Sequence, residues 1–247
     1  MESFRIAVAQ TSSIKGDIEA NVRTHIEFVK IAIKHFVDVI VFPELSLTGY
    51  EPEIVHDVAV NLEDKRLIPL KEQAKQFGIT IIAGAPISKR HEKPYIGAFI
   101  LGPNESMIYT KNYLHPGEET YYSEGLKKSC IINIRGEKVG VAICADVNHS
   151  SHFEVVARKG ATIYAAGVLM MGGYGEAVEK LRQYAIKYSM IAAMANYGAM
   201  TGGYLPAGKS AIWDQKGRRL AEADEKGNAM VIGMKKQGEW EGMTVKI

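Results

Sequence analysis

The 247-residue sequence has few cysteines, no long apolar run and almost no excess of one charge. Its two cysteines, Cys130 and Cys144, are too few for a disulfide framework, and we expect both thiols to be reduced. A net charge of +2 excludes a field strong enough to collect nucleic acid or anionic lipid. No uninterrupted apolar stretch approaches the length of a membrane-spanning helix. We therefore expect no nucleic-acid or membrane partner and a small-molecule substrate.

We also find no targeting signal, repeat or linker in the sequence. Met1–Arg5 leads straight into the strand-like segment 6–9 without an apolar signal region, so we expect a cytoplasmic protein. The residues are 47% hydrophobic and 23% charged, which is typical of a folded chain with a large core. Without a repeat period or a linker, the simplest interpretation is a single domain over 1–247.

Short β-branched runs alternate with segments of helical period, which predicts an α/β fold. We expect helices at 17–35, 62–77, 153–159 and 176–189. We expect strands at 4–10, 37–42, 80–83, 95–101, 107–110, 131–134, 138–143, 162–165, 190–196, 209–213 and 228–234. Ligands of α/β folds usually lie where strands end, so the polar residues that follow strands are the candidates for chemistry.

Three such strand ends carry reactive side chains. Glu44 follows a buried strand and Pro43, and burial would raise its pKa toward the range of a general base. Lys111 ends a predicted hairpin, where an ammonium can hold an oxyanion and a later carboxylate can orient it. Cys144 ends another strand at a polar turn, where backbone N–H groups can bind an oxyanion. Taken singly, these residues could also be a loop-capping glutamate, a solvated lysine and an inert core cysteine.

The motifs together resemble the nitrilase superfamily of carbon-nitrogen hydrolases. The resemblance begins with the run 7–10 (Ala-Val-Ala-Gln) and continues with the run 42–45 (Phe-Pro-Glu-Leu), then Thr48, Gly49 and Tyr50. It extends through Lys111, Leu114, Pro116, Glu118, Tyr121, Tyr122 and Gly125, and then Gly140, Ile143, Cys144 and Asp146. Later similarities are the run 195–198, the run 208–210, Ile212 and Gly217. The similarity spans almost the whole chain and favours the catalytic interpretation of the three strand ends.

This resemblance implies a four-layer αββα sandwich with pseudo-twofold halves, assembled as a homodimer or higher homo-oligomer. Glu44 would be the base, Cys144 the nucleophile, and Lys111 with the backbone N–H of Ala145 the oxyanion hole. The family spacing favours Glu118 over Glu119 as the carboxylate that orients these groups.

The implied reaction is hydrolysis of a small non-peptide amide or N-carbamoyl bond through a thioester. No metal or organic cofactor is needed, because cysteine is a competent nucleophile. Tyr50, Asn148 and His149 are the candidate substrate-binding residues. The segment 147–152 departs from the arginine, aromatic, proline and glutamate that many members carry there, so no named substrate transfers.

Four alternatives stay open. The chain could be an idle binding or scaffold member, hydrolyse nitriles, or transfer its acyl group to an amine, although membrane-bound acyltransferases of the superfamily carry transmembrane helices. An unrelated hydrolase with His149 or His152 as its base is the least favoured, because both lie very near Cys144 in sequence.

Overall fold

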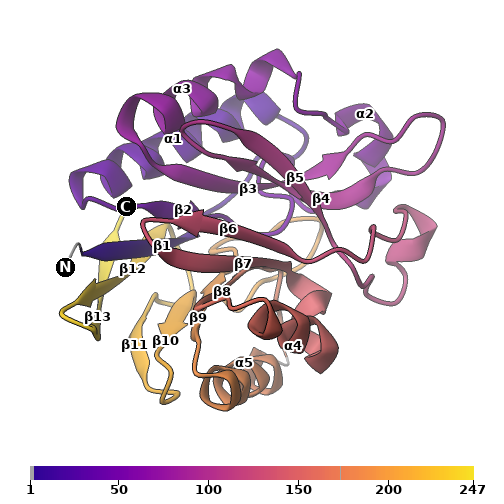
Figure 1. Ribbon diagram of the computed structural model, residues 1–247. Helices are drawn as coiled ribbons and strands as arrows, with labels where there is room; N and C mark the ends of the chain where they lie inside the picture. The colour runs from indigo at the N-terminus through magenta and orange to yellow at the C-terminus, as the bar shows by residue number, and fades with distance from the viewer. Residues whose placement is uncertain (1–2, 173) are drawn as a thin grey trace.

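The computed structural model describes residues 3–172 and 174–247 and contains two β-sheets between layers of helices (Figure 1). The first sheet has the order β13 (Glu239–Lys246), β12 (Ala229–Lys236), β1 (Phe4–Gln10), β2 (Val39–Val41), β3 (Thr80–Ile87), β4 (Tyr95–Leu101), β5 (Ser106–Thr110). The second has the order β11 (Arg219–Glu222), β10 (Ala211–Trp213), β9 (Ile191–Ala195), β8 (Ile163–Gly167), β7 (Glu137–Ile143), β6 (Cys130–Ile134). The α-helices are α1 (Ile18–Lys34), α2 (Val55–Val58), α3 (Ile68–Phe77), α4 (Ser150–Arg158) and α5 (Tyr174–Tyr188). The 3-10 helices are η1 (Pro52–Ile54), η2 (Lys65–Leu67), η3 (Glu118–Thr120) and η4 (Cys144–Asn148).

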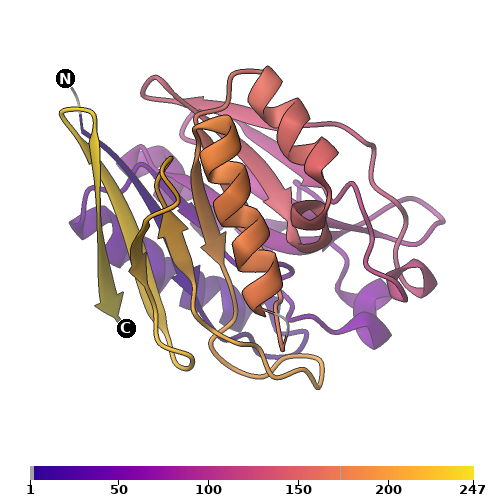
Figure 2. The same ribbon diagram turned by 90° about the horizontal axis from the view of Figure 1, so that it is seen from below.

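The predicted four-layer αββα sandwich is confirmed. Helices α1 and α3 cover the outer face of the first sheet, and α4 and α5 cover that of the second (Figures 1 and 2). In β1, Ile6 and Val8 share the core between the sheets, whereas Ala7 and Ala9 pack under α1. Because side chains alternate along a strand, β1 is buried on both faces and reads as a nearly continuous apolar run.

Each sheet is built around three parallel strands. Strands β1, β2 and β3 are parallel neighbours in the first sheet, and β7, β8 and β9 are parallel neighbours in the second. Antiparallel strands flank both triplets. This common pattern agrees with two related halves. Glu44 follows β2 of one triplet and Cys144 follows β7 of the other.

The expected elements are present with different limits in several places. The predicted helix 62–77 is divided, since α3 begins at Ile68 with Pro69 in its first turn, where the missing N–H breaks no helical bond. It ends at Gly78 in the left-handed conformation, as predicted (φ 67°). The strand expected at 37–42 is only Val39–Val41.

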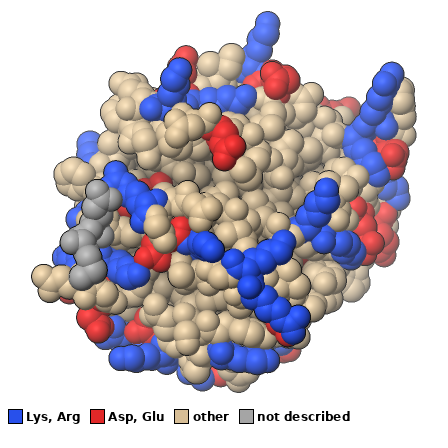
Figure 3. Space-filling model, viewed as in Figure 1, with Lys and Arg blue, Asp and Glu red and all other residues tan. Residues whose placement is uncertain are grey.

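Strands β11 and β13 were not predicted. Their side chains are largely exposed or half-exposed, so neither carries the apolar signal of a buried strand. Among the described residues, no helix combines the length and hydropathy that crossing a membrane requires. Lys and Arg side chains are spread over the face drawn in Figure 3, and Asp and Glu lie among them.

Candidate active site

Glu44 lies in a turn between the two sheets. The turn follows β2, and Leu45 adopts a positive φ of 54°. Gly167 of β8 allows a close approach, because a Cβ there would lie 2.5 Å from the Phe42 carbonyl oxygen. The Tyr197 hydroxyl donates to the Glu44 carbonyl oxygen at 2.8 Å. The turn is therefore held by the second sheet as well as by its own.

Lys111 follows β5 and is completely buried in an acidic cluster. Its Nζ donates to Glu44 Oε1 at 2.8 Å and to both carboxylate oxygens of Glu118 at 2.8 and 2.7 Å. Glu118 also accepts from the Tyr50 hydroxyl at 2.9 Å and from the His115 N–H at 2.7 Å. The choice of Glu118 over Glu119 as the partner of Lys111 thus agrees with the geometry.

Cys144 occupies the elbow after β7, at the first residue of η4. Its φ of 40° lies in the left-handed region, which is uncommon for a residue with a Cβ and turns the thiol out of the strand direction. The Sγ donates weakly to the Leu169 carbonyl oxygen at 3.7 Å. The Cys144 thiol is also close enough to Glu44 to affect its pKa, and Glu44 Oε2 is buried without another hydrogen-bond partner.

Asp146 connects the turn at Cys144 to the loop that follows Lys111. Its Oδ1 accepts from the backbone N–H groups of Asn112 and Tyr113 at 3.0 and 3.1 Å, directly after Lys111. Its Oδ2 accepts from the Tyr109 hydroxyl at 2.7 Å and from the Ile143 N–H at 3.0 Å. One fully buried carboxylate therefore joins β5 of the first sheet to the end of β7 in the second.

The electrostatics of the cluster favour a protonated thiol beside a base. Burial raises the pKa of Glu44 to about 7, although the charge of Lys111 opposes this shift. Burial and the charge of Glu44 raise the pKa of Cys144 well above its ordinary value. Burial alone would lower the pKa of Lys111, but the charges of Glu44, Cys144 and Glu118 outweigh it and raise that pKa. Near neutral pH the lysine is charged, and the thiol needs a base to lose its proton.

A cavity of about 250 Å³ opens above these residues. Glu44, Glu118 and Cys144 line it together with Tyr50. A second cavity of about 310 Å³ meets it at Cys144 and includes Asn148 among its lining residues. Both cavities are large enough to hold parts of a small organic molecule.

The remaining predicted residues take different positions. Ala145 is buried directly after Cys144, near the start of η4. His149 is not among the residues that line either cavity, and its ring stacks on Tyr113 at 3.7 Å. His152 is buried, bonded to the Tyr109 and Tyr164 hydroxyls, and burial lowers its pKa.

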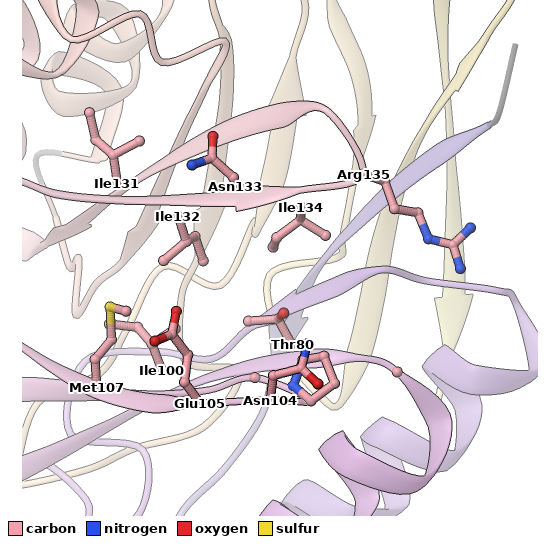
Figure 4. A pocket seen from close by; sticks show the side chains of 13 residues that line it. Thr80, Ile100, Asn104, Glu105, Met107, Ile131, Ile132, Asn133, Ile134 and Arg135 are labelled. Carbon is pink, nitrogen blue, oxygen red and sulfur yellow. The ribbon is translucent and has the colours of Figure 1, made fainter.

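A larger hollow of about 360 Å³ lies between the edges of the two sheets, away from these groups. Figure 4 shows Ile131 to Arg135 on the β6 side, with Glu105 and Met107 opposite them. Its only charged lining residues among those described are Glu105 and Arg135, and Arg135 is paired with Asp38 at 2.9 Å. It contains no nucleophile with a base, so size does not select it as the reactive site.

Several contributors carried no recognisable sequence signal. Leu169, Met171 and Tyr204 line the Cys144 cavity from loops that are distant in sequence. Tyr197 belongs to the run 195–198 that resembles the family, but that run did not indicate the hydrogen bond from its hydroxyl to the Glu44 carbonyl oxygen. Asp146 was visible only as part of the cysteine motif, which did not indicate its four hydrogen bonds. Within the described ranges, no group of three or more His, Cys, Asp and Glu is arranged to hold a metal ion.

Comparison with known proteins identifies the family. The model of the carbon-nitrogen hydrolase family matches residues 5–241. The chain belongs to the carbon-nitrogen hydrolase family. The resemblance to the nitrilase superfamily inferred from the motifs is thereby confirmed.

Relatives in this family differ in their described activities. The chain is 31% identical to a glutamine-dependent NAD(+) synthetase of Thermotoga maritima over 60% of its own length and 26% of the synthetase. It thus spans only about a quarter of the length of that relative. It is 26% identical to an (R)-stereoselective amidase of Pseudomonas sp., over 89% of this chain and 81% of the amidase.

A solved structure shares the fold. An amidase from Nesterenkonia sp. AN1, studied as a mutant in complex with butyramide, superposes with a TM-score of 0.85 at 21% identity. The match covers 93% of this chain and 89% of the amidase. The two proteins therefore share the four-layer fold.

Proposed function

We propose that this carbon-nitrogen hydrolase cleaves a small non-peptide amide or N-carbamoyl bond through a thioester on Cys144. One observation carries the proposal: a carboxylate from the first sheet, a thiol from the second and an ammonium buried beside the carboxylate meet at one cavity. Those three groups are the base, nucleophile and charge stabiliser that acyl transfer needs.

Acylation begins with Glu44 as the general base. Because the pKa of Cys144 is raised, the thiol is protonated at neutral pH and cannot rely on a preformed thiolate. Glu44, with a pKa of about 7, is half ionised at that pH and takes the thiol proton as sulfur attacks the carbonyl carbon. The proton then passes from Glu44 to the leaving nitrogen, the carbon–nitrogen bond breaks, and ammonia or an amine departs.

Lys111 and the Ala145 backbone N–H stabilise the oxyanion in this proposal. Three hydrogen bonds occupy the ammonium in the absence of substrate, two of them to Glu118. The ammonium exchanges one Glu118 contact for the oxyanion, and the other keeps it oriented. Removal of one such donor typically costs about a hundredfold or more in rate.

Deacylation uses the same groups. Glu44 takes a proton from water, and the resulting hydroxide attacks the thioester carbon. The sulfur–carbon bond breaks, the carboxylic acid product leaves, and Glu44 returns its proton to the Cys144 sulfur. No cofactor enters this cycle, because the nucleophile, the base and the oxyanion donors all belong to the chain.

The activities described for the relatives support an amide substrate. They include an (R)-stereoselective amidase and a glutamine-dependent synthetase, and the solved amidase holds butyramide. Tyr50 and Asn148, which line the two cavities beside Cys144, are the proposed substrate contacts, whereas His149 lines neither cavity. We also propose that the chain is a single cytoplasmic domain and that it assembles as a homodimer or higher homo-oligomer. Exposed apolar residues of α4 and α5, such as Val155 and Ile186, would lie in the contact between subunits.

The test compares the native protein with Cys144→Ala on a panel of small amides, ureido acids and nitriles. We expect ammonia or amine release and an acyl mass on the native protein alone, detected by intact-mass spectrometry. Release from nitriles only would support nitrile hydrolysis, and acyl transfer to an added amine in preference to water would support a transferase. No product and no adduct from any compound would support the idle binding interpretation.

A further inference from the structure

Cys144 lies at the junction of two cavities whose walls differ in charge. Both cavities include His115, Cys144, Leu169 and Met171. Beyond these shared residues, one cavity extends toward Glu44 and Glu118, and the other toward the first turns of α5. We name them the Glu44 cavity and the Lys180 cavity. A substrate carbonyl above Cys144 can therefore extend one substituent into each.

The proton path decides which substituent enters the Glu44 cavity. In the proposed reaction the leaving nitrogen receives its proton from Glu44, so it has to lie within hydrogen-bond reach of that carboxyl group. Glu44 lines only the first of the two cavities. The leaving amine consequently occupies the Glu44 cavity, and the acyl substituent, on the other side of the carbonyl carbon, extends into the Lys180 cavity.

The Glu44 cavity suits a neutral amine. The charged residues that line it, among those described, are the carboxylates Glu44 and Glu118, and no Lys or Arg lines it. The rings of Tyr50, Tyr121 and Tyr204 form apolar walls. Its volume of about 250 Å³ far exceeds one ammonia molecule, so an organic amine also fits.

The Lys180 cavity combines apolar walls with one ion pair, because both Lys180 and Glu176 line it. Met170, Met171 and Ala177 line it, and Lys180 is the only Lys or Arg among its described lining residues. Lys180 Nζ pairs with Glu176 at 3.0 Å, but the side chains are 36% and 79% exposed. An exposed pair one helical turn apart is weak, so a substrate carboxylate can recruit the ammonium at little cost.

We infer that the Lys180 cavity is the acyl subsite and that Lys180 selects acyl groups that end in a carboxylate. This assignment rests on the proposed function and adds the direction in which the substrate lies. The apolar walls contact the methylene groups of the acyl chain, and the ammonium meets its anionic end. Anionic groups on the amine side are disfavoured by Glu44 and Glu118.

Two amides of equal length isolate the contribution of Lys180. The acyl group of succinamate ends in a carboxylate, whereas that of butyramide ends in a methyl group. For Lys180→Met we expect kcat/KM for succinamate to fall by about fivefold, the scale of one partly exposed ion pair. Butyramide should change by less than about twofold, as for an ordinary surface substitution. Lys187→Met is the matched control, because Lys187 lies on the same helix, is exposed and lines neither cavity.

A charge reversal provides the converse test. Lys180→Glu should lower kcat/KM for succinamate further and raise it for 3-aminopropanamide, whose acyl group ends in an ammonium. Equal effects of Lys180→Met and Lys187→Met on succinamate, or equal losses on succinamate and butyramide, would overturn the assignment while leaving the hydrolase proposal intact. Turnover of neither amide, with no acyl mass on Cys144 from any amide or ureido acid, would contradict the hydrolase proposal itself.

Discussion

The surroundings of the two cysteines differ far more than their burial does. Cys130 lies within β6 opposite Val141 of β7, and Cys144 lies at the end of the same β7. Both thiols are free and both residues are partly buried. Burial alone raises the pKa of Cys130 to about 11. At Cys144 burial acts together with Glu44, Lys111 and Glu118, which surround the thiol with charges of both signs.

This difference shows that burial alone does not separate Cys144, the proposed nucleophile, from Cys130. A thiol in a strand faces the neighbours that the sheet supplies, which at Cys130 are apolar residues of the core between the sheets. A thiol at an elbow with positive φ faces loops from both sheets, where Glu44 and Lys111 lie. The base and the cation, rather than the thiol, make the second position suited to catalysis.

Replacement of each cysteine by alanine in turn should produce the largest difference in activity between two variants. Cys144→Ala should lower amide turnover by about a thousandfold or more, because it removes the nucleophile. Cys130→Ala should leave turnover within about twofold, since its thiol reaches none of the three groups. Ammonia release under saturating substrate measures both. A comparable loss in Cys130→Ala, with its melting temperature preserved, would show that the comparison assigns the wrong thiol.

Asp146, which is bonded to the strand end before Cys144 and to the loop after Lys111, provides the next comparison of two variants. Asp146→Asn places an amide N–H where Asp146 accepts four hydrogen bonds, so Lys111 and Cys144 should separate slightly. We expect kcat to fall by about tenfold to a hundredfold, because small displacements of reacting groups are costly. Loss of buried hydrogen bonds should also lower stability by about 1–3 kcal/mol.

Asp214→Asn is the control for this loss of stability. Asp214 is also buried and accepts from the N–H groups of Lys216 and Arg218, in the turn after β10 and outside both cavities. It should lower the melting temperature without a matching loss of kcat. If both variants lose kcat in proportion to stability, Asp146 has only a structural role.

The pH dependence is the finest test of the charges around Cys144. Glu44 has to be ionised to accept the thiol proton, and its pKa is raised to about 7, so kcat/KM should rise as pH increases through about 7. The charge of Glu118 contributes to that raised pKa. Glu118→Gln should therefore lower the pKa of Glu44 and move the rise to lower pH.

Glu119→Gln is the neighbouring control. Glu119 accepts from the Gly117 N–H at 2.7 Å and is exposed, so its neutralisation should leave the midpoint unchanged. Profiles of kcat/KM against pH for the three proteins measure the shift. An unmoved midpoint in Glu118→Gln, or an equal shift in both variants, would mean that another group controls the profile.

The sequence predicted the candidate residues better than their surroundings. Glu44, Lys111, Glu118 and Cys144 were identified from motifs at strand ends. In the structure Glu44, Glu118 and Cys144 line one cavity, and Lys111 is paired with both carboxylates. The walls could not be predicted in the same way. Leu169, Met171 and Tyr204 are ordinary residues of long loops, and nothing local indicates that those loops approach β7. The position of His149 against Tyr113 likewise depends on a contact between separate loops.

Local patterns in the sequence determined the helices, most strands and the left-handed turn at Gly78, because these depend on side-chain period and on the conformations a residue tolerates within a few positions. The tertiary structure alone decided that a glutamate after β2 and a cysteine after β7 would meet. They belong to different sheets, and only the packing of those sheets, joined at Asp146, brings a carboxyl group with a pKa of about 7 against the partly buried Cys144 thiol. Burial and mutual charge arise from that packing, so residue order could indicate the groups but not their reactivity.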